Sequence, residues 1–599
     1  MLGKKSWVIL SSSILAVLFL AEAVMFVQIV RLNMLPLKFV IGILCVLLVI
    51  LGAVWVLFIA GINVRKPYKA RRVRRIIGAV ISLIVILASI FVDLFTDKVI
   101  RTIANVTDDN VTVSTKYGVY VLADDPAKDI KDAKKYTFAI MDSYDKENTQ
   151  VAVTKLGEAI GTTVTPKKYV SVVELANGLY KKEVKAIIMN ESFVDIIKDT
   201  QGFKDFESKT KLIYEISVET KTKKSDKSKS KTKVTSEPFV VYISGSDTRE
   251  ETLTMEKSRS DSNIIMVVNP NTKQILMINT PRDFYVPNPA CGGALDKLTH
   301  CGLYGMEDSI EALEQLYEVK AEFYLQINFV GFSKLVDILG GITVYSPQAF
   351  DSSLSDYSYC EGDNYLNGDQ AIFFARERYS FATGDRERGN NQMRLIQALI
   401  KKLTEDSSSV LANYSDILDA LSGMFLTNFT ADQISSLVKM QLGDNAKWDI
   451  RTYSVTGSDG SDFTASAPGE MAYVMYPDYS TVQKAIELID MIMDGKVITD
   501  DILEAPPTTS GKGREPEYHN HNNNDFLELT EEYTETTDTS EETEETTEAT
   551  EEDTTEEVTT EEVTSEEITE EETTSEEVPS ETSEDSETHE PTEPENSEE

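Results

Sequence analysis

The last part of this 599-residue chain lacks basic residues. Residues 525–599 contain no lysine and no arginine but 34 aspartates and glutamates, so the net charge of −41 falls to −7 outside this segment. The segment also has too few large apolar side chains to offset the entropy lost on ordering. We predict that residues 506–599 form a disordered Thr/Ser/Glu-rich tail, which is either a solvated, self-repelling extension or a segment that binds cations or a basic partner.

Cysteine is also scarce, with four residues: Cys45, Cys291, Cys301 and Cys360. None of them forms a CxxC pair, and His300 adjoins Cys301 without the usual ligand spacing, which argues against a zinc site. Cys45 lies inside an apolar run and is expected to be an inert small side chain.

Three apolar runs near the N-terminus, 7–30, 39–62 and 76–95, have few charged residues. Each is about 20 residues long, enough to cross a hydrocarbon core of ~30 Å as a helix. A signal peptide is shorter and is not followed by two more spans. We predict that residues 1–95 form three transmembrane helices that stay in the mature protein.

The distribution of basic residues predicts the orientation of these spans. The segment NVRKPYKARRVRR between the second and third runs has seven lysines and arginines, whereas the connection RLNMLPLK has two. The positive-inside rule places the N-terminus and the richer segment in the cytoplasm, and everything after residue 95 outside. We therefore expect a multi-pass protein of the cell membrane. An oxidising exterior allows one disulfide, for which Cys291 with Cys301 is our prediction, although the sequence leaves the pairing open.

The part of the chain that is predicted to lie outside the membrane consists of segments with different compositions. Residues 107–220 mix alternating and helix-like patterns, which indicates a small α/β accessory domain. Residues 221–237 are basic and lack apolar periodicity, so they are either a linker or an exposed loop, or alternatively a contact for an anionic polymer or lipid. Residues 404–505 are interpreted as a C-terminal extension of the extracytoplasmic region.

Residues 238–403 interleave strand and helix patterns. Strands are predicted at 239–245 and 322–329, and a hairpin at 263–283 turns at Asn269-Pro270-Asn271. Helical periodicity appears at 305–319, 329–341, 368–379 and 385–403, with Gly340-Gly341 ending the second helix and Asp385 as the N-cap of the last. This order predicts an α/β/α layered domain with a mixed central sheet.

Polar residues recur where these apolar elements end: Asp247, Asp261, Arg282, Asp283, Arg376, Arg378, Asp385, Arg388 and Gln392. Strand ends in a layered α/β domain face a common crevice, so these side chains are predicted to converge. Arginine forks bind phosphate oxygens, and one or two carboxylates with phosphate hold a divalent cation. The pattern therefore favours phosphoryl chemistry, although Asp385 with Arg388 is also an ordinary i, i+3 helix pair.

Six segments in order resemble the LytR-CpsA-Psr family: GSDTRE, SRSDSNIIMVV, INTPRDFYV, DKLTHCGLYG, FVGFSKLVDILGGITV and LNGDQAIFFARERYSFATGDRERGNNQMRLI. Three spans and an accessory domain are similar to capsule-type members. The resemblance implies an α/β/α sandwich with a hydrophobic tunnel for a polyprenyl lipid. It also implies a phosphotransferase that moves a glycopolymer, such as teichoic acid or capsule polysaccharide, from polyprenyl pyrophosphate to peptidoglycan in the wall of Gram-positive bacteria.

The same resemblance assigns expected roles to single residues. Asp247 and Asp261 would hold Mg²⁺ or Mn²⁺, and Asp385 would orient Arg388 or act as a base. The remaining expected contacts to the pyrophosphate are Arg282, Arg376, Arg378, Arg388, Lys297, Gln392 and Arg249. The chain departs from many members at Asn391, where they have an arginine, and in the cysteines that flank Lys297.

The expected partners are the polyprenyl-pyrophosphate-linked glycopolymer, the peptidoglycan acceptor and membrane lipid. A nucleic-acid partner is not expected, because the recognisable domain is predicted to be outside the membrane. Alternative functions are a polyprenyl-pyrophosphate phosphatase, a polymer-binding scaffold, and a non-catalytic regulator or attenuator.

Overall fold

The computed structural model describes most of the chain before the tail. The described ranges are 4–62, 67–106, 110–223, 230–246, 259–406, 416–417, 425–511 and 514–515. The predicted tail after residue 515 lies outside them, and so do Asp247 and Arg249.

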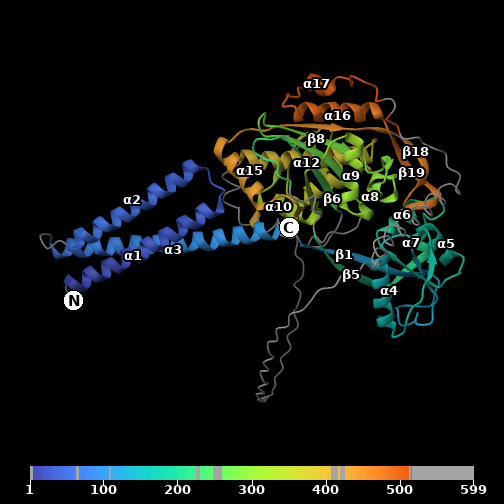
Figure 1. The fold of residues 1–599 in the computed structure, drawn as a ribbon, viewed down its shortest axis with the longest axis horizontal. Coiled ribbons are helices and arrows are strands. Elements are labelled where there is room, and N and C mark those ends of the chain that lie inside the picture. Colours follow the sequence, from blue (N-terminus) through green and yellow to red (C-terminus); the bar gives the residue numbers. More distant parts are fainter. Residues whose placement is uncertain are drawn as a thin grey trace, which may run out of the picture. The chain divides into compact units, whose positions relative to one another are not determined.

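Three long apolar helices open the chain, drawn in blue in Figure 1: α1 (Lys4–Leu32), α2 (Leu37–Ile62) and α3 (Tyr68–Val106). Each is long and apolar enough to cross a membrane. Leu18, Val54 and Phe58 are buried where the three helices pack together. The predicted spans are therefore present as helices, and α3 continues past the expected end at residue 95.

The accessory segment contains a five-stranded sheet with the strand order β3-β2-β4-β1-β5. Its strands are β1 (Asn110–Leu122), β2 (Phe138–Met141), β3 (Lys167–Tyr169), β4 (Ala186–Asn190) and β5 (Thr210–Lys223). Its helices are α4 (Lys146–Ile160), α5 (Val172–Tyr180), α6 (Phe193–Asp199) and α7 (Phe206–Lys209). One apolar cluster includes side chains of α4 and another includes those of α5 and α6, so this segment has the predicted α/β character. Strand β5 extends into the residues expected to begin the linker.

The larger sheet has six strands in the order β16-β11-β6-β7-β8-β17. They are β6 (Phe239–Ser246), β7 (Ser262–Asn269), β8 (Gln274–Thr280), β11 (Phe323–Asn328), β16 (Phe425–Thr427) and β17 (Asp449–Ser454). β6, β7 and β8 pair antiparallel in sequence, whereas β11 is parallel to β6 and β17 is parallel to β8. The sheet is mixed, as predicted.

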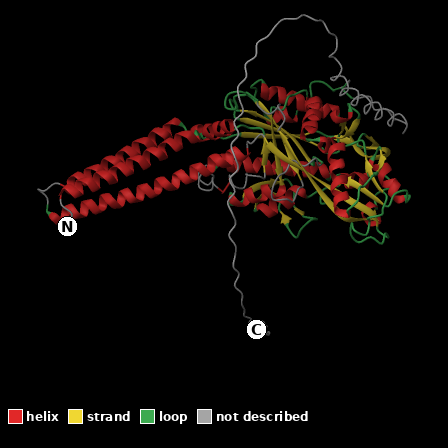
Figure 2. Cartoon of the chain, turned by 60° about the horizontal axis from the view of Figure 1, so that its bottom comes forward, coloured by secondary structure: helices red, strands yellow, loops and turns green. Residues whose placement is uncertain are grey.

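Side chains alternate between the two faces of this sheet, because successive residues of a strand point in opposite directions. Val240 and Tyr242 pack in a cluster with α9 (Met306–Tyr317) and α16 (Tyr479–Met493). Val241 and Ile243 pack with α12 (Asp385–Glu405). Helices α10 (Phe329–Ile338) and α11 (Gly368–Arg376) build a further cluster on α12. In Figure 2 the yellow strands lie between red helices, the predicted α/β/α layering.

Short elements connect these layers. They are β9 (Tyr285–Pro287), η2 (Pro289–Cys291), β10 (Leu295–Lys297), α8 (Leu298–Tyr304), β12 (Ile342–Ser346), β13 (Phe350–Asp351), β14 (Ser358–Tyr359), β15 (Gly362–Leu366), α15 (Ala431–Asp444), β18 (Gly457–Thr464), β19 (Ala467–Pro477) and α17 (Asp500–Glu504). β18 and β19 form a long antiparallel hairpin. The predicted extension 404–505 thus supplies both edge strands of the large sheet and one covering helix, so the layered fold continues beyond residue 403.

The predicted Cys291–Cys301 disulfide is absent, because all four cysteines are free in the structure. Burial raises the pKa of the Cys291 thiol to about 12 and that of Cys301 well above its usual value. A disulfide forms through a thiolate, and both surroundings keep the thiol protonated.

Candidate functional site

Four of the polar residues predicted to converge, Arg282, Asp283, Arg378 and Asp385, line a cavity of about 410 Å³ beyond the end of β8. Its walls come from the segment after β8, from the turn before α12 and from β19. The lining residues are Pro281, Arg282, Asp283, Arg378, Tyr379, Phe381, Gly384, Asp385, Tyr473 and Met475.

Arg282 lies among three carboxylates. Its Nη1 is 3.0 Å from Asp261 Oδ1, and its Nε is 3.5 Å from Asp283 Oδ2 and 3.6 Å from Asp385 Oδ1. Burial opposes the charge of Arg282, but the three carboxylates outweigh it and raise the pKa of Arg282 above its ordinary value. The guanidinium is therefore a fixed positive charge at the base of the cavity.

Asp261 is ionised in this setting. Burial alone would raise its pKa, but Arg282, Arg259 and Arg388 together lower it below the ordinary value. The Thr299 hydroxyl also donates to Asp261 Oδ1, at 3.5 Å. Asp261 thus offers an oxygen anion beside three arginines.

Asp385 and Arg388 lie on the first turn of α12. Asp385 is the first helical residue and not the predicted N-cap, a position that Gly384 takes with a φ of 50° that favours glycine. The Arg388 Nη2 lies 2.7 Å from Asp385 Oδ1. Burial raises the pKa of Asp385, although Arg388 and Arg282 oppose this, and burial also lowers the pKa of Arg388.

A close approach of α12 to the sheet puts this pair in place. A side chain at Gly389 would meet Asn279 of β8 at 2.3 Å, so glycine allows the contact. Two buried atoms of the cluster, Arg282 Nε and Asp385 Oδ1, form no hydrogen bond within the described part of the chain, despite lying within ion-pair distance. Such atoms are suited to a polar ligand.

Lys297 reaches the same cluster from β10. Its side chain is 2% exposed, and its Nζ lies 3.4 Å from Asp283 Oδ1 and 5.8 Å from the centre of the Tyr473 ring. The structure therefore brings Lys297, which only the family resemblance had suggested, near Arg282, Asp261, Asp385 and Arg388.

Arg376 and Arg378 flank the buried Glu377 at the end of α11. The guanidinium of Arg378 stacks on the Tyr379 ring at 4.5 Å, and Arg378 lines the cavity, whereas Arg376 lies over the Phe329 ring at 5.5 Å. Arg378 thus belongs to the cavity, and Arg376 lies against α10.

Comparison with known proteins identifies the family. The LytR_cpsA_psr family model matches residues 209–484. The polyisoprenyl-teichoic acid–peptidoglycan teichoic acid transferase TagU of Bacillus cereus is 32% identical over 236 residues, which are 39% of this chain and 75% of that protein. The chain belongs to the LytR-CpsA-Psr family. TagU of Oceanobacillus iheyensis is also 32% identical, over 36% of this chain and 66% of its own length.

Solved structures are similar over a comparable share of the chain. Bacillus subtilis TagV is 26% identical and covers 44% of this chain and 99% of its own, with a TM-score of 0.36. The structure described as TagT bound to LIIa-WTA is 21% identical and covers 45% of this chain and 96% of its own, with a TM-score of 0.36. More than half of this LytR-CpsA-Psr chain lies outside each of these similarities.

Gln392 lies on the apolar side of α12. It lines a separate cavity of about 50 Å³ between the sheet and α10, α11 and α12, together with Ile243, Phe332 and Ile372. Asn391, where many LytR-CpsA-Psr proteins have arginine, is 1% exposed and donates to the Phe374 carbonyl of α11. Asn391 therefore joins two helices and does not face the polar cavity.

Several residues of the site were not among the predicted ones. Arg259 is in the quoted SRSD motif, but only the structure shows that its charge acts on Asp261. Tyr473 and Met475 come from β19, in a segment without a recognisable motif. Glu377 had one usable signal, its position between two arginines. The predicted Asp247 and Arg249 lie outside the described residues.

The buried carboxylate of Glu377 accepts hydrogen bonds that hold the segment carrying Arg378 in place. It is 0% exposed and accepts hydrogen bonds from the backbone of Ser353 at 2.6 Å, Arg378 at 3.0 Å and Ser380 at 3.1 Å. Burial alone would raise the pKa of Glu377, but bonds from Ser353, Ser380 and Ser352 outweigh it and lower the pKa.

Replacing Glu377 by glutamine is expected to lower the free energy of unfolding by about 2 kcal/mol, because charge-assisted hydrogen bonds are lost. The carboxylate stabilises the fold above the ordinary glutamate pKa, and this contribution disappears as the pH falls through its lowered pKa. Urea unfolding at several pH values should therefore show that the difference in free energy of unfolding between wild type and Glu377→Gln becomes smaller at acid pH. The exposed Glu361→Gln change is the control, and a pH-independent difference would contradict this role.

A divalent cation fits the chemistry of this site through Asp261. Mg²⁺ binds one or two carboxylates together with phosphate oxygens and water. Asp261, whose pKa is lowered by neighbouring arginines, offers carboxylate oxygens beside the cavity. No group of three metal-ligating side chains occurs among the residues that the structure describes. Phosphate oxygens and water would share the coordination of an ion held by Asp261.

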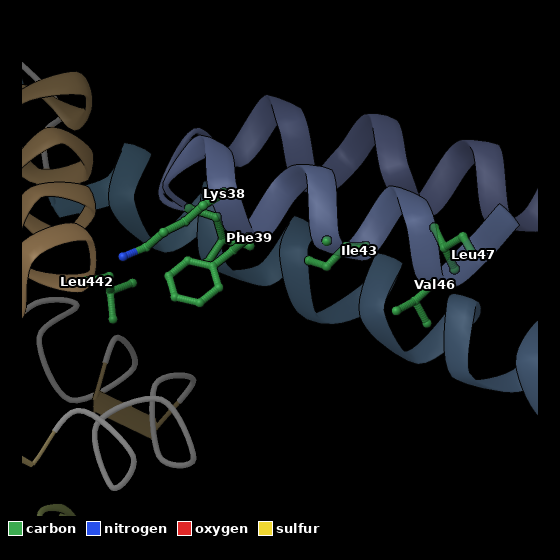
Figure 3. A pocket seen from close by; sticks show the side chains of 8 residues that line it. Lys38, Phe39, Ile43, Val46, Leu47 and Leu442 are labelled. Carbon is green, nitrogen blue, oxygen red and sulfur yellow. The ribbon is translucent and has the colours of Figure 1, made fainter. Parts of the chain in front are cut away.

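Another cavity, about 470 Å³, lies between α2 and α15 and has a different character (Figure 3). Its walls are apolar except for Lys38, whose Nζ donates to the Gly443 carbonyl at 2.6 Å. Phe39 and Leu442 face this space from the two helices. The lining carries no carboxylate and no arginine, unlike that of the cavity around Arg282.

Proposed function

We propose that this protein transfers a glycopolymer of the teichoic-acid or capsule type from polyprenyl pyrophosphate to peptidoglycan. The Arg282 cluster carries this proposal, since buried arginines beside an ionised carboxylate suit a pyrophosphate. The names of the TagU relatives, which specify a polyisoprenyl-linked teichoic acid and peptidoglycan, support the same substrates.

In this reaction an acceptor hydroxyl attacks the phosphorus on the polymer side, the bond to the polyprenyl-phosphate oxygen breaks, and polyprenyl phosphate leaves, while the hydroxyl proton passes to the leaving phosphate or to water. Arg282, Arg388 and Arg378 would bind the phosphate oxygens and stabilise the charge that develops on them. Asp385 would hold Arg388 in its orientation through the 2.7 Å ion pair. The protein thus contributes mainly positioning and electrostatics.

Asp261 would hold a Mg²⁺ or Mn²⁺ ion, with Asp247 as the second carboxylate expected from the family resemblance. Such an ion neutralises phosphate charge during transfer. The number of positive and negative side chains around the site supports the need for a bound cation. Five cations lie at or beside the site, Arg259, Arg282, Lys297, Arg378 and Arg388, against five nearby carboxylates, Asp195, Asp199, Asp261, Asp283 and Asp385. The protein alone leaves little positive charge for a pyrophosphate.

We also propose that the catalytic segment lies outside the cell membrane, where peptidoglycan is found. The basic residues between α2 and α3 support this orientation through the positive-inside rule. Membrane lipid would then contact the three anchoring helices.

The full-length protein in lipid nanodiscs, supplied with polyprenyl-pyrophosphate-linked teichoic acid, peptidoglycan and Mg²⁺, is expected to form peptidoglycan-linked polymer. EDTA should abolish the product and added Mg²⁺ should restore it. Mass spectrometry of the digested peptidoglycan distinguishes the outcomes. Free polymer phosphate would instead indicate a phosphatase, and no turnover with retained binding of the donor would indicate a scaffold or regulator.

A further inference from the structure

Helix α6 of the accessory segment packs against α8 and forms ion pairs with Arg259 and Lys297, which lie beside the Arg282 cluster. Its apolar residues Phe193, Ile196 and Ile197 are buried in a cluster that also includes Leu303 of α8. The accessory residue Thr200, which follows α6, forms an isolated bridge with Ala472 of β19. The accessory and catalytic segments therefore share an apolar core at this helix.

Two carboxylates of α6, Asp195 and Asp199, are one turn apart and therefore lie on the same helical face. Asp195 Oδ2 accepts a hydrogen bond of 2.6 Å from Arg259 Nη2, and Asp199 Oδ2 lies 3.8 Å from Arg259 Nη1. Asp199 Oδ2 is also 3.7 Å from Lys297 Nζ. Both carboxylates thus engage cations of the catalytic site.

These contacts belong to a chain of alternating charges. Lys297 connects Asp199 to Asp283, and Arg282 connects Asp283 to Asp261. Arg259 donates a hydrogen bond to Asp195 of α6, and its charge lowers the pKa of Asp261. The residues of α6 are the only members of this described network that come from the accessory segment.

Because the side chain of Lys297 is buried and that of Arg259 is mostly buried, their positions depend on the carboxylates of α6. Lys297 is 2% exposed and Arg259 is 17% exposed, so neither has free access to water. Lys297 Nζ sits between two carboxylates, neither close enough for a short hydrogen bond. Loss of Asp199 would leave the ammonium held from one side, and loss of Asp195 would free the Arg259 fork to take other rotamers.

We propose that Asp195 and Asp199 are positioning residues of the donor site, so that the accessory segment sets the affinity for the pyrophosphate-bearing lipid. They act through Arg259 and Lys297, whose charges adjoin Asp261 and Asp283 of the Arg282 cluster and would act on the bound pyrophosphate before and during transfer alike. An interaction of equal strength in the bound substrate and in the transition state affects only KM. Its loss therefore raises KM and leaves kcat nearly unchanged. This inference rests on the proposed function.

The test uses the full-length protein in nanodiscs with both aspartates replaced. Asp195→Asn with Asp199→Asn is expected to raise KM for the lipid-linked donor about tenfold, with kcat within about threefold of wild type. Binding of farnesyl pyrophosphate with Mg²⁺, measured by calorimetry, should weaken by a similar factor. The double change to glutamate keeps both charges and should stay within about threefold of wild type.

Glu183→Gln is the matched control, because Glu183 pairs with Lys167 at 2.7 Å within the accessory segment. Thermal unfolding checks that each variant is folded. Unchanged KM and unchanged farnesyl pyrophosphate binding would overturn the proposal, and so would tighter binding, which would make the aspartates competitors of the donor. If wild type transfers no polymer, the proposed function fails, while the binding measurement still decides this inference.

Discussion

Replacing Arg282 by lysine is expected to lower kcat/KM for polymer transfer about 100-fold, the size found when one group that stabilises a developing charge is removed. Lysine keeps the positive charge, so the carboxylates of Asp261, Asp283 and Asp385 still have a cation beside them. The protein should therefore remain folded. Lysine lacks the planar fork that reaches all three carboxylates and phosphate oxygens together. Quantified peptidoglycan-linked product from purified wild-type and variant proteins gives the ratio.

The matched control is Arg451→Lys on β17. Arg451 also pairs with two carboxylates, Asp449 and Asp500, but it is not among the residues that line the catalytic cavity. The control should retain transfer within about twofold, as expected for a partly exposed ion pair. Equal activity of Arg282→Lys and wild type would refute the central role of Arg282.

Replacing Asp385 by asparagine is expected to reduce kcat about 100-fold and to change the pH profile. The ionised carboxylate orients Arg388, so wild-type activity should rise with pH through the pKa of Asp385. Burial raises this pKa above the ordinary aspartate value, and the acid limb is expected at correspondingly higher pH. The variant has no such group, so that limb should vanish from rates measured between about pH 4 and 8.

Asp432→Asn provides the comparison, because Asp432 is an exposed acid in the first turn of α15. It should leave the rate and the acid limb unchanged. An Asp385→Asn protein with the wild-type acid limb would show that another group titrates there, and Asp385 would then have no role in orienting Arg388 through its charge.

Local patterns predicted the elements of the fold well. The hairpin of β7 and β8 was recognisable because two apolar runs flank a strong turn signal. The end of α10 was recognisable at Gly340 and Gly341, whose φ angles of 73° and 94° favour glycine. In both cases the information lies within a few residues of the feature.

Other features depend on contacts between distant segments, which no local pattern specifies. β17 pairs with β8 although about 170 residues separate them, and Tyr473 enters the catalytic cavity from a hairpin without a motif. The sequence suggested Asp385 as a helix cap because aspartate commonly has that role. Arg282 from the segment after β8 and Arg388 one turn along α12 explain why its carboxylate is used differently.

The small apolar cavity beside Gln392 has a consequence for the rate of lipid exchange. At about 50 Å³ it has room for little more than a few water molecules, so the polyprenyl chain that the family resemblance leads us to expect here would enter only if α10 and α11 moved away from the sheet. The same movement must precede departure of the chain once its phosphate bond has been broken. Escape of the spent carrier is therefore expected to limit turnover, and a burst of product in the first cycle would reveal this delay.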